Sequence, residues 1–191
     1  MLLNINSDEV LGNCLEMAFE LKKYMIIMDS VSKEDFKATK EFRKIYNGFY
    51  RVAFKSSEWY DKYYQLMEEQ KKEQRTIGEI LSELTAVKST VEVSFASKLI
   101  ATINPDMPIW DQYVLRNLGL ENEWTKYSTE SKEERIKRAV DIYDRIQSFY
   151  SDFQLSDEGK KCICVIDAAL PQYADKITTT KKIDYILWSK R

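Results

Sequence analysis

The chain has 191 residues, of which 44% are apolar and 31% are charged, and its formal net charge is −2. This length fits one domain of residues 1–191, or a core of residues 76–191 with an N-terminal helical extension of residues 1–75. Five glycines, three prolines and no histidine are present, a composition that favours a compact all-α, multi-helix domain and excludes Ser-His and Cys-His catalysis.

Hydroxyl side chains followed by acidic ones mark the expected helix starts. Ser32, Thr76 and Ser131 each precede an Asp or Glu by three residues, which is the capping-box spacing. Ser7 and Ser156 are followed at once by acidic residues, which favour a first helical turn. Apolar periodicity predicts helices over residues 7–28, 33–46 (extending toward residue 54), 58–75, 76–87, 93–103, 112–118, 132–153, 159–170 and 181–188.

Two of these predicted helices have unusual faces. The helix over residues 58–75 begins with an aromatic cluster at residues 59–64, a candidate surface for a protein partner, and ends in a charged run typical of a solvated face. The helix over residues 159–170 is apolar nearly all round. We therefore expect that helix at the centre of the domain, with Cys162 and Cys164 as small buried hydrophobic residues.

The cysteines and the hydropathy pattern bear on the cellular compartment. The three cysteines lack the CxxC and CxxH spacings, which argues against a disulfide framework or a zinc site. No stretch reaches the roughly 18 apolar residues of a membrane span, and no signal-peptide pattern is present. We expect a cytoplasmic protein without a membrane partner. The weakly negative net charge argues against a dedicated nucleic-acid binder but is compatible with a local basic patch.

The most informative stretch is VSFASKLIATINPDMPIWDQYVLRNLGL, residues 93–120. An apolar helical run ends at Pro105, and a short turn bounded by a second proline follows. Asp111 stands at the start of the next predicted helix, which Gly119 ends. Aspartate is a favoured N-cap residue, so capping alone explains its position. Lys98 has an equally simple role as an amphipathic lysine whose stem packs while its charge reaches water.

The segment PIWDQYVLRNLGL resembles the part of the helix-hairpin-helix DNA glycosylase superfamily that carries the catalytic aspartate. The preceding SFASKLIATINPDM is similar to the post-hairpin helix of that superfamily, especially of its 8-oxoguanine glycosylase-like branch. The resemblance covers residues 76–120. It implies a helix-hairpin-helix element, DNA as the partner, and a DNA-repair hydrolase that removes a damaged base.

The resemblance also implies roles for individual residues. Asp111 matches the aspartate that stabilises the sugar cation or helps water or lysine attack C1′, because glycosidic cleavage has an oxocarbenium-like transition state. Lys88, Ser89 and Thr90 fall in the hairpin turn, which in the family holds a DNA phosphate and often an alkali cation, the one cofactor implied. The Schiff-base lysine of bifunctional members falls near Ser94. Further implied nucleic-acid contacts are the rings of Trp110 and Tyr113 and the charges of Arg116 and Lys126.

Departures from the family pattern leave alternatives open. The hairpin lacks glycines, Glu92 adds a negative charge to it, and Ser94 stands where a lysine is expected. Lys98 or Lys88 could replace that lysine only with a shift in alignment, so hydrolysis by Asp111 needs fewer assumptions. Three interpretations follow: an active glycosylase with Asp111 and Lys98 as catalytic candidates, a non-catalytic relative that binds DNA or protein, and an interaction protein that uses the aromatic face of residues 59–64.

Overall fold

The computed structural model describes residues 7–33, 35–36, 38–125 and 129–190, and every regular element within these ranges is a helix. The expected all-α class is therefore confirmed. The helices are α1 (Ser7–Gly12), α2 (Cys14–Val31), α3 (Lys40–Tyr50), α4 (Ser57–Gln70), α5 (Ile77–Val87), α6 (Val93–Ile103), α7 (Gln112–Asn117), α8 (Glu121–Thr125), α9 (Lys132–Leu155), α10 (Asp157–Ala169) and α11 (Thr179–Ser189).

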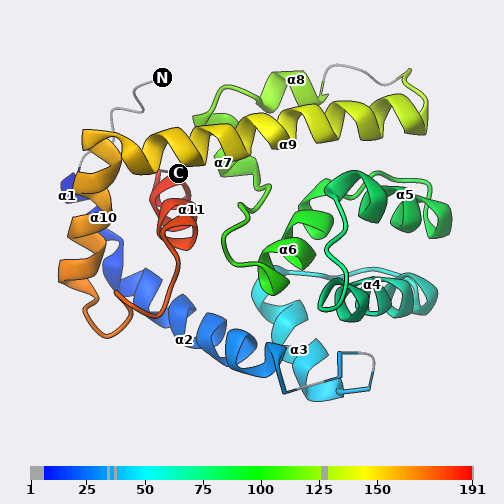
Figure 1. The fold of residues 1–191 in the computed structure, drawn as a ribbon, viewed down its shortest axis with the longest axis horizontal. Coiled ribbons are helices and arrows are strands. Elements are labelled where there is room, and N and C mark those ends of the chain that lie inside the picture. The colour runs from blue at the N-terminus through cyan, green and yellow to red at the C-terminus, as the bar shows by residue number, and fades with distance from the viewer. Residues whose placement is uncertain (1–6, 34, 37, 126–128, 191) are drawn as a thin grey trace.

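The helices enclose the segment that leads from α6 to α7 (Figure 1). Along one side runs α9, and α10 turns away from its end to pack on α1. On the opposite side α2 leads to α3, while α4, α5 and α6 pack on one another. Between α9 and α2 in this view lies α11, which packs on α7, α9 and α10. The first helix thus lies against the C-terminal helices α10 and α11.

An aromatic cluster between α3, α4 and α6 fills part of the core. Trp59, Tyr63 and Tyr46 are fully buried. The hydroxyls of Tyr46 and Tyr63 lie 2.8 Å apart, and Tyr63 donates to the carbonyl of Phe95 at 2.9 Å. The expectation that the aromatic face of residues 59–64 meets a protein partner is therefore wrong, because α3 and α6 already cover that face.

The capping signals place most helix starts correctly. Thr76 and Ser131 each form a complete capping box, and Ser156 accepts the N–H of Gly159 at the start of α10. Ser32 is an exception, because it is the C-cap of α2, and α3 begins only at Lys40. The local sequence signal at Ser32 is overridden by packing, since a buried residue of the following loop, Phe36, stacks on Phe42.

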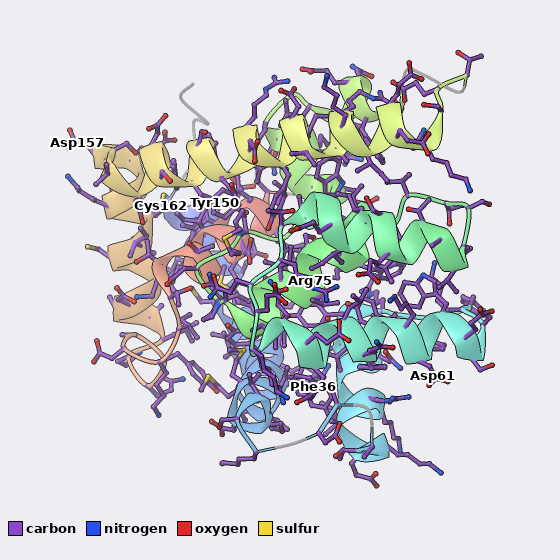
Figure 2. All side chains as sticks on the ribbon, turned by 45° about the vertical axis from the view of Figure 1, so that its right-hand side comes forward. Phe36, Asp61, Arg75, Tyr150, Asp157 and Cys162 are labelled. Atoms are coloured by element: carbon purple, nitrogen blue, oxygen red, sulfur yellow. The ribbon has the colours of Figure 1, made fainter. Side chains whose placement is uncertain are left out.

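Three further expectations are corrected. The first predicted helix is divided into α1 and α2 at Asn13, whose side chain donates to the carbonyl of Glu9. The short helix α8 was not predicted from the sequence. The α10 helix is not central, because Gly159 and Ile166 are buried on one face while Cys164 is exposed on another. Cys162 is buried as expected, on the side of α10 that packs inward (Figure 2).

Candidate functional site

The loop of residues 104–111 carries Asp111 and is held from several sides. The Tyr143 hydroxyl of α9 donates to the carbonyl of Pro108 at 2.7 Å. The Thr178 hydroxyl donates to the carbonyl of Pro105 at 2.7 Å. These contacts join residues more than 30 positions apart in the chain. The loop therefore has a defined path that neither proline could fix alone.

Two more hydrogen bonds hold the last residues of this loop. The backbone N–H of Trp110 donates to the hydroxyl of Ser97 at 2.9 Å. The backbone N–H of Ile109 donates to the carboxylate of Asp184 at 3.3 Å. Asp111 follows as the N-cap of α7, where its Oδ1 accepts the N–H of Tyr113 at 2.8 Å. Capping engages this one oxygen, and no other hydrogen bond to the carboxylate occurs among the described residues.

Asp111 also lines a cavity of about 320 Å³. Its walls come from the start of α2, the end of α3, the middle of α6, the loop before α7 and the helix α11. Lys98 and Tyr113 line the same cavity, so the structure brings together three of the predicted site residues. The remaining lining residues are Glu16, Glu20, Lys23, Gly48, Phe49, Tyr50, Arg51, Ile109, Gln112, Val114, Lys181, Asp184, Tyr185 and Trp188.

Lys98 has an unusual environment for a lysine. Its ammonium group donates to the carbonyl of Tyr50 at 3.1 Å and lies 5.3 Å from the ring centre of Phe95. No carboxylate lies within 4.0 Å of it among the described residues. Burial lowers the pKa of Lys98, and the negative charge of Asp111 opposes this effect. Lys98 therefore loses its proton at a lower pH than an exposed lysine does.

A buried polar network on α11 was not found from the sequence. The Asp184 carboxylate accepts the Tyr150 hydroxyl at 2.8 Å and lies 3.5 Å from the ammonium of Lys181. Tyr150 lies on the side of α9 that faces α11 (Figure 2). Burial raises the pKa of Asp184 and lowers that of Lys181. The one available signal was a Lys-x-x-Asp spacing within an otherwise apolar helix end.

The turn between α5 and α6, where the resemblance places the hairpin, lies outside the cavity lining. Its negative charge, Glu92, is paired with the ammonium groups of Lys88 and Lys55 and accepts the Thr90 hydroxyl at 3.0 Å. Ser89 is exposed. Positive charge at this turn thus comes from two lysines of the chain, and the alkali cation stays a prediction.

The other predicted contacts also lie away from the cavity lining. The buried ring of Trp110 packs edge-on against Trp124 at 5.1 Å. Arg116 is exposed and lies 3.7 Å from Glu121. Ser94 is partly buried on α6. Lys126 lies outside the described residues.

Comparisons with known proteins add no assignment. No family model, curated protein or solved structure matches the chain. Within the described ranges, no helix has the length and apolar character needed to cross a membrane. The same ranges hold no group of three or more Cys, Asp or Glu side chains placed to bind a metal ion. The site is therefore interpreted from its own geometry.

Proposed function

We propose that the chain is a glycosylase-like protein of the helix-hairpin-helix type, which hydrolyses the N-glycosidic bond of a damaged base in DNA. The observation that carries this proposal is the position of Asp111, which caps α7 with one oxygen while lining a cavity. A carboxylate held in this way stabilises positive charge that develops on a sugar ring. In the reaction the C1′–N bond breaks and its electron pair leaves with the base. A water molecule then adds to C1′, and this water loses a proton.

The cavity has the size and the walls that a single extruded base needs. Small-molecule sites occupy roughly 300–1,000 Å³, and this cavity of about 320 Å³ lies at the lower end of that range. The aromatic rings of Phe49, Tyr113 and Trp188 are among its lining groups. Enzymes that act on bases commonly stack the extruded base against such rings.

A loop beside the cavity offers a means of contact with the double helix. Arg51 lines the cavity, and Phe54, three residues further on, is fully exposed. Both residues have positive φ, at 55° and 58°, and they are the two non-glycine residues of the described chain that do. Such backbone conformations are costly and occur often at functional sites. An exposed aromatic ring three residues from a cavity-lining arginine is suited to stacking on an unpaired base.

Base release from a panel of duplexes, each with one damaged or mismatched base, tests the proposal. We expect the protein to release at least one of these bases, and we expect Phe54→Ala to lower this release without changing the melting temperature. Lys160→Ala, on the exposed side of α10, is the matched control. A protein that binds duplexes in a salt-dependent way but releases no base would be the non-catalytic relative instead.

Lys98 defines a second, separable question about the same site. Its lowered pKa and its place on the cavity wall suit an amine that attacks C1′. Borohydride reduction on an abasic duplex would trap the resulting imine. We expect any trapped adduct to disappear in Lys98→Ala and to persist in Lys160→Ala. An adduct that persists in Lys98→Ala would exclude this role while leaving hydrolysis by Asp111 intact.

A further inference from the structure

Two tyrosine hydroxyls at the cavity lack hydrogen-bond partners. Tyr50 and Tyr185 line the cavity, and both hydroxyl oxygens are buried without a partner within the described part of the chain. The Tyr50 hydroxyl lies near Thr102 but forms no hydrogen bond of standard geometry with it. Buried polar groups are rarely left without partners, so each such group calls for a ligand or another explanation.

The Tyr185 hydroxyl is buried near charged groups that line the cavity. Burial raises its pKa, and the negative charges of Glu20 and Asp184 raise it further. Both of these carboxylates also line the cavity. The charges of cavity-lining groups thus act on this hydroxyl, and no group of the described residues accepts its proton.

A third donor, the ammonium group of Lys181, lies beside Tyr185. It is 5.1 Å from the ring centre of Tyr185 and 4.8 Å from that of Tyr24. Within the described ranges its one ion-pair partner is Asp184, at 3.5 Å. Asp184 is engaged further by Tyr150 and by a backbone N–H. An ammonium group carries three protons, so Lys181 has donor capacity left for a ligand.

We infer that Lys181, Tyr185 and Tyr50 form a subsite that binds a ring carbonyl oxygen of the base, so that the site prefers keto bases to amino bases. This inference rests on the proposed function for its ligand class. A carbonyl oxygen has two lone pairs, so it accepts hydrogen bonds from two of these donors at a time. An exocyclic amino group at the same place would point its protons at the ammonium of Lys181, which accepts no hydrogen bond.

The charge of the cavity favours a neutral carbonyl over an anion. Four basic and four acidic side chains line it, so their formal charges cancel. Asp184 lies within 3.5 Å of the Lys181 ammonium, and the charge of Asp111 also acts on it. A phosphate or carboxylate group bound here would be repelled by both carboxylates, whereas a carbonyl oxygen carries only a partial charge.

Binding of free bases to the intact protein tests the inference apart from catalysis. Hypoxanthine and purine form a matched pair, because the first adds a ring carbonyl to the ring system of the second. By calorimetry we expect hypoxanthine to bind about ten- to a hundredfold more tightly than purine. We expect Tyr185→Phe to remove most of this advantage while leaving the affinity for purine unchanged. Tyr173→Phe, a tyrosine outside the cavity lining, is the control.

The possible outcomes separate the subsite from the proposed function. Equal affinities, no binding of either base, or a Tyr185→Phe variant that keeps the full preference would each overturn the subsite. Inorganic phosphate that competes with hypoxanthine would show an anion site instead. If Tyr185→Phe does not fold, Tyr50→Phe provides the same comparison. A keto preference without base release from any duplex would support the subsite and refute the glycosidic hydrolysis.

Discussion

Replacement of Asp111 separates its capping role from its proposed chemical role. Asparagine caps a helix about as well as aspartate, so Asp111→Asn should change the free energy of unfolding by less than about 0.5 kcal/mol. Alanine removes the acceptor of the N–H of Tyr113, a bond of 2.8 Å. Asp111→Ala should therefore cost about 1 kcal/mol, which lowers the melting temperature of a chain of this size by about 2–4 °C.

The rate effect of Asp111→Asn follows from the charge that is lost. At an effective dielectric constant of about 20, a carboxylate stabilises a full positive charge at about 4 Å by about 4 kcal/mol. The charge on the sugar is partial and partly screened, so we expect a loss between about 2 and 4 kcal/mol. This corresponds to a release rate about 30- to 1,000-fold lower. Loss of the same charge also lowers the pKa values of Lys98 and Lys181, since Asp111 raises both.

Single-turnover base release and thermal unfolding, measured on the same protein preparations, check both statements. We expect Asp111→Asn to release base more slowly at an unchanged melting temperature. We expect Asp111→Ala to release base more slowly and also to melt at a lower temperature. An Asp111→Asn variant that releases base at the wild-type rate would show that the charge has no chemical role. An Asp111→Asn variant destabilised as much as Asp111→Ala would show that the carboxylate contributes to folding through something other than the cap.

Four further variants test the framework of the fold. Gly159→Ala should cost about 3 kcal/mol or more in unfolding free energy, because its Cβ would lie 1.8 Å from a backbone carbonyl. Gly48→Ala, in a helix with open space around it, should instead stabilise the protein by about 0.5–1 kcal/mol. Urea unfolding tests both variants. The hydrogen bond from Lys62 lowers the pKa of Glu83. The ionised Glu83 side chain therefore stabilises the fold fully above about pH 4.3. This stabilisation is lost as the pH falls through the lower folded pKa. Glu83→Gln should therefore flatten the loss of urea resistance below about pH 4, and an unchanged acid profile would contradict this. Ser97→Ala leaves a backbone N–H of the Asp111 loop without its acceptor and should cost about 1–3 kcal/mol, with base release slowed beyond what the melting temperature explains.

Local signals explain why much of the helical framework was predictable from the sequence. The capping boxes at Thr76 and Ser131 depend on atoms four residues apart or fewer, so the sequence determines them directly. The signal at Ser32 fails because Phe36 is drawn into the core and its backbone N–H donates to Glu68. The aromatic run at the start of α4 could not be read as core or surface, since that depends on where α3 and α6 pack.

The candidate site shows the same division between local and distant causes. The position of Asp111 at the start of a helix was predictable, because a proline-bounded loop and a following helix are local features. Its neighbours in the cavity were not predictable, because Lys181 and Asp184 come from α11, 70 and 73 residues further along the chain. The spacing of Lys181 and Asp184 resembles an ordinary helical ion pair. Only packing against Tyr150 and Ile109 makes the pair buried and gives it a place in the cavity wall.

The cavity therefore depends on distant parts of the chain more than on the loop that carries Asp111. The cavity lining includes Glu16 and Glu20 of α2, while α11 supplies Lys181 and Tyr185, whose hydroxyl has no partner among the described residues. Neither helix belongs to the segment that carries the family resemblance. In our proposal that segment supplies the carboxylate at the reacting carbon, whereas α11 and Tyr50 of α3 supply the groups that would distinguish one base from another. Substitutions on α11 should thus alter which base is bound, and substitutions at Asp111 should alter how fast it is released.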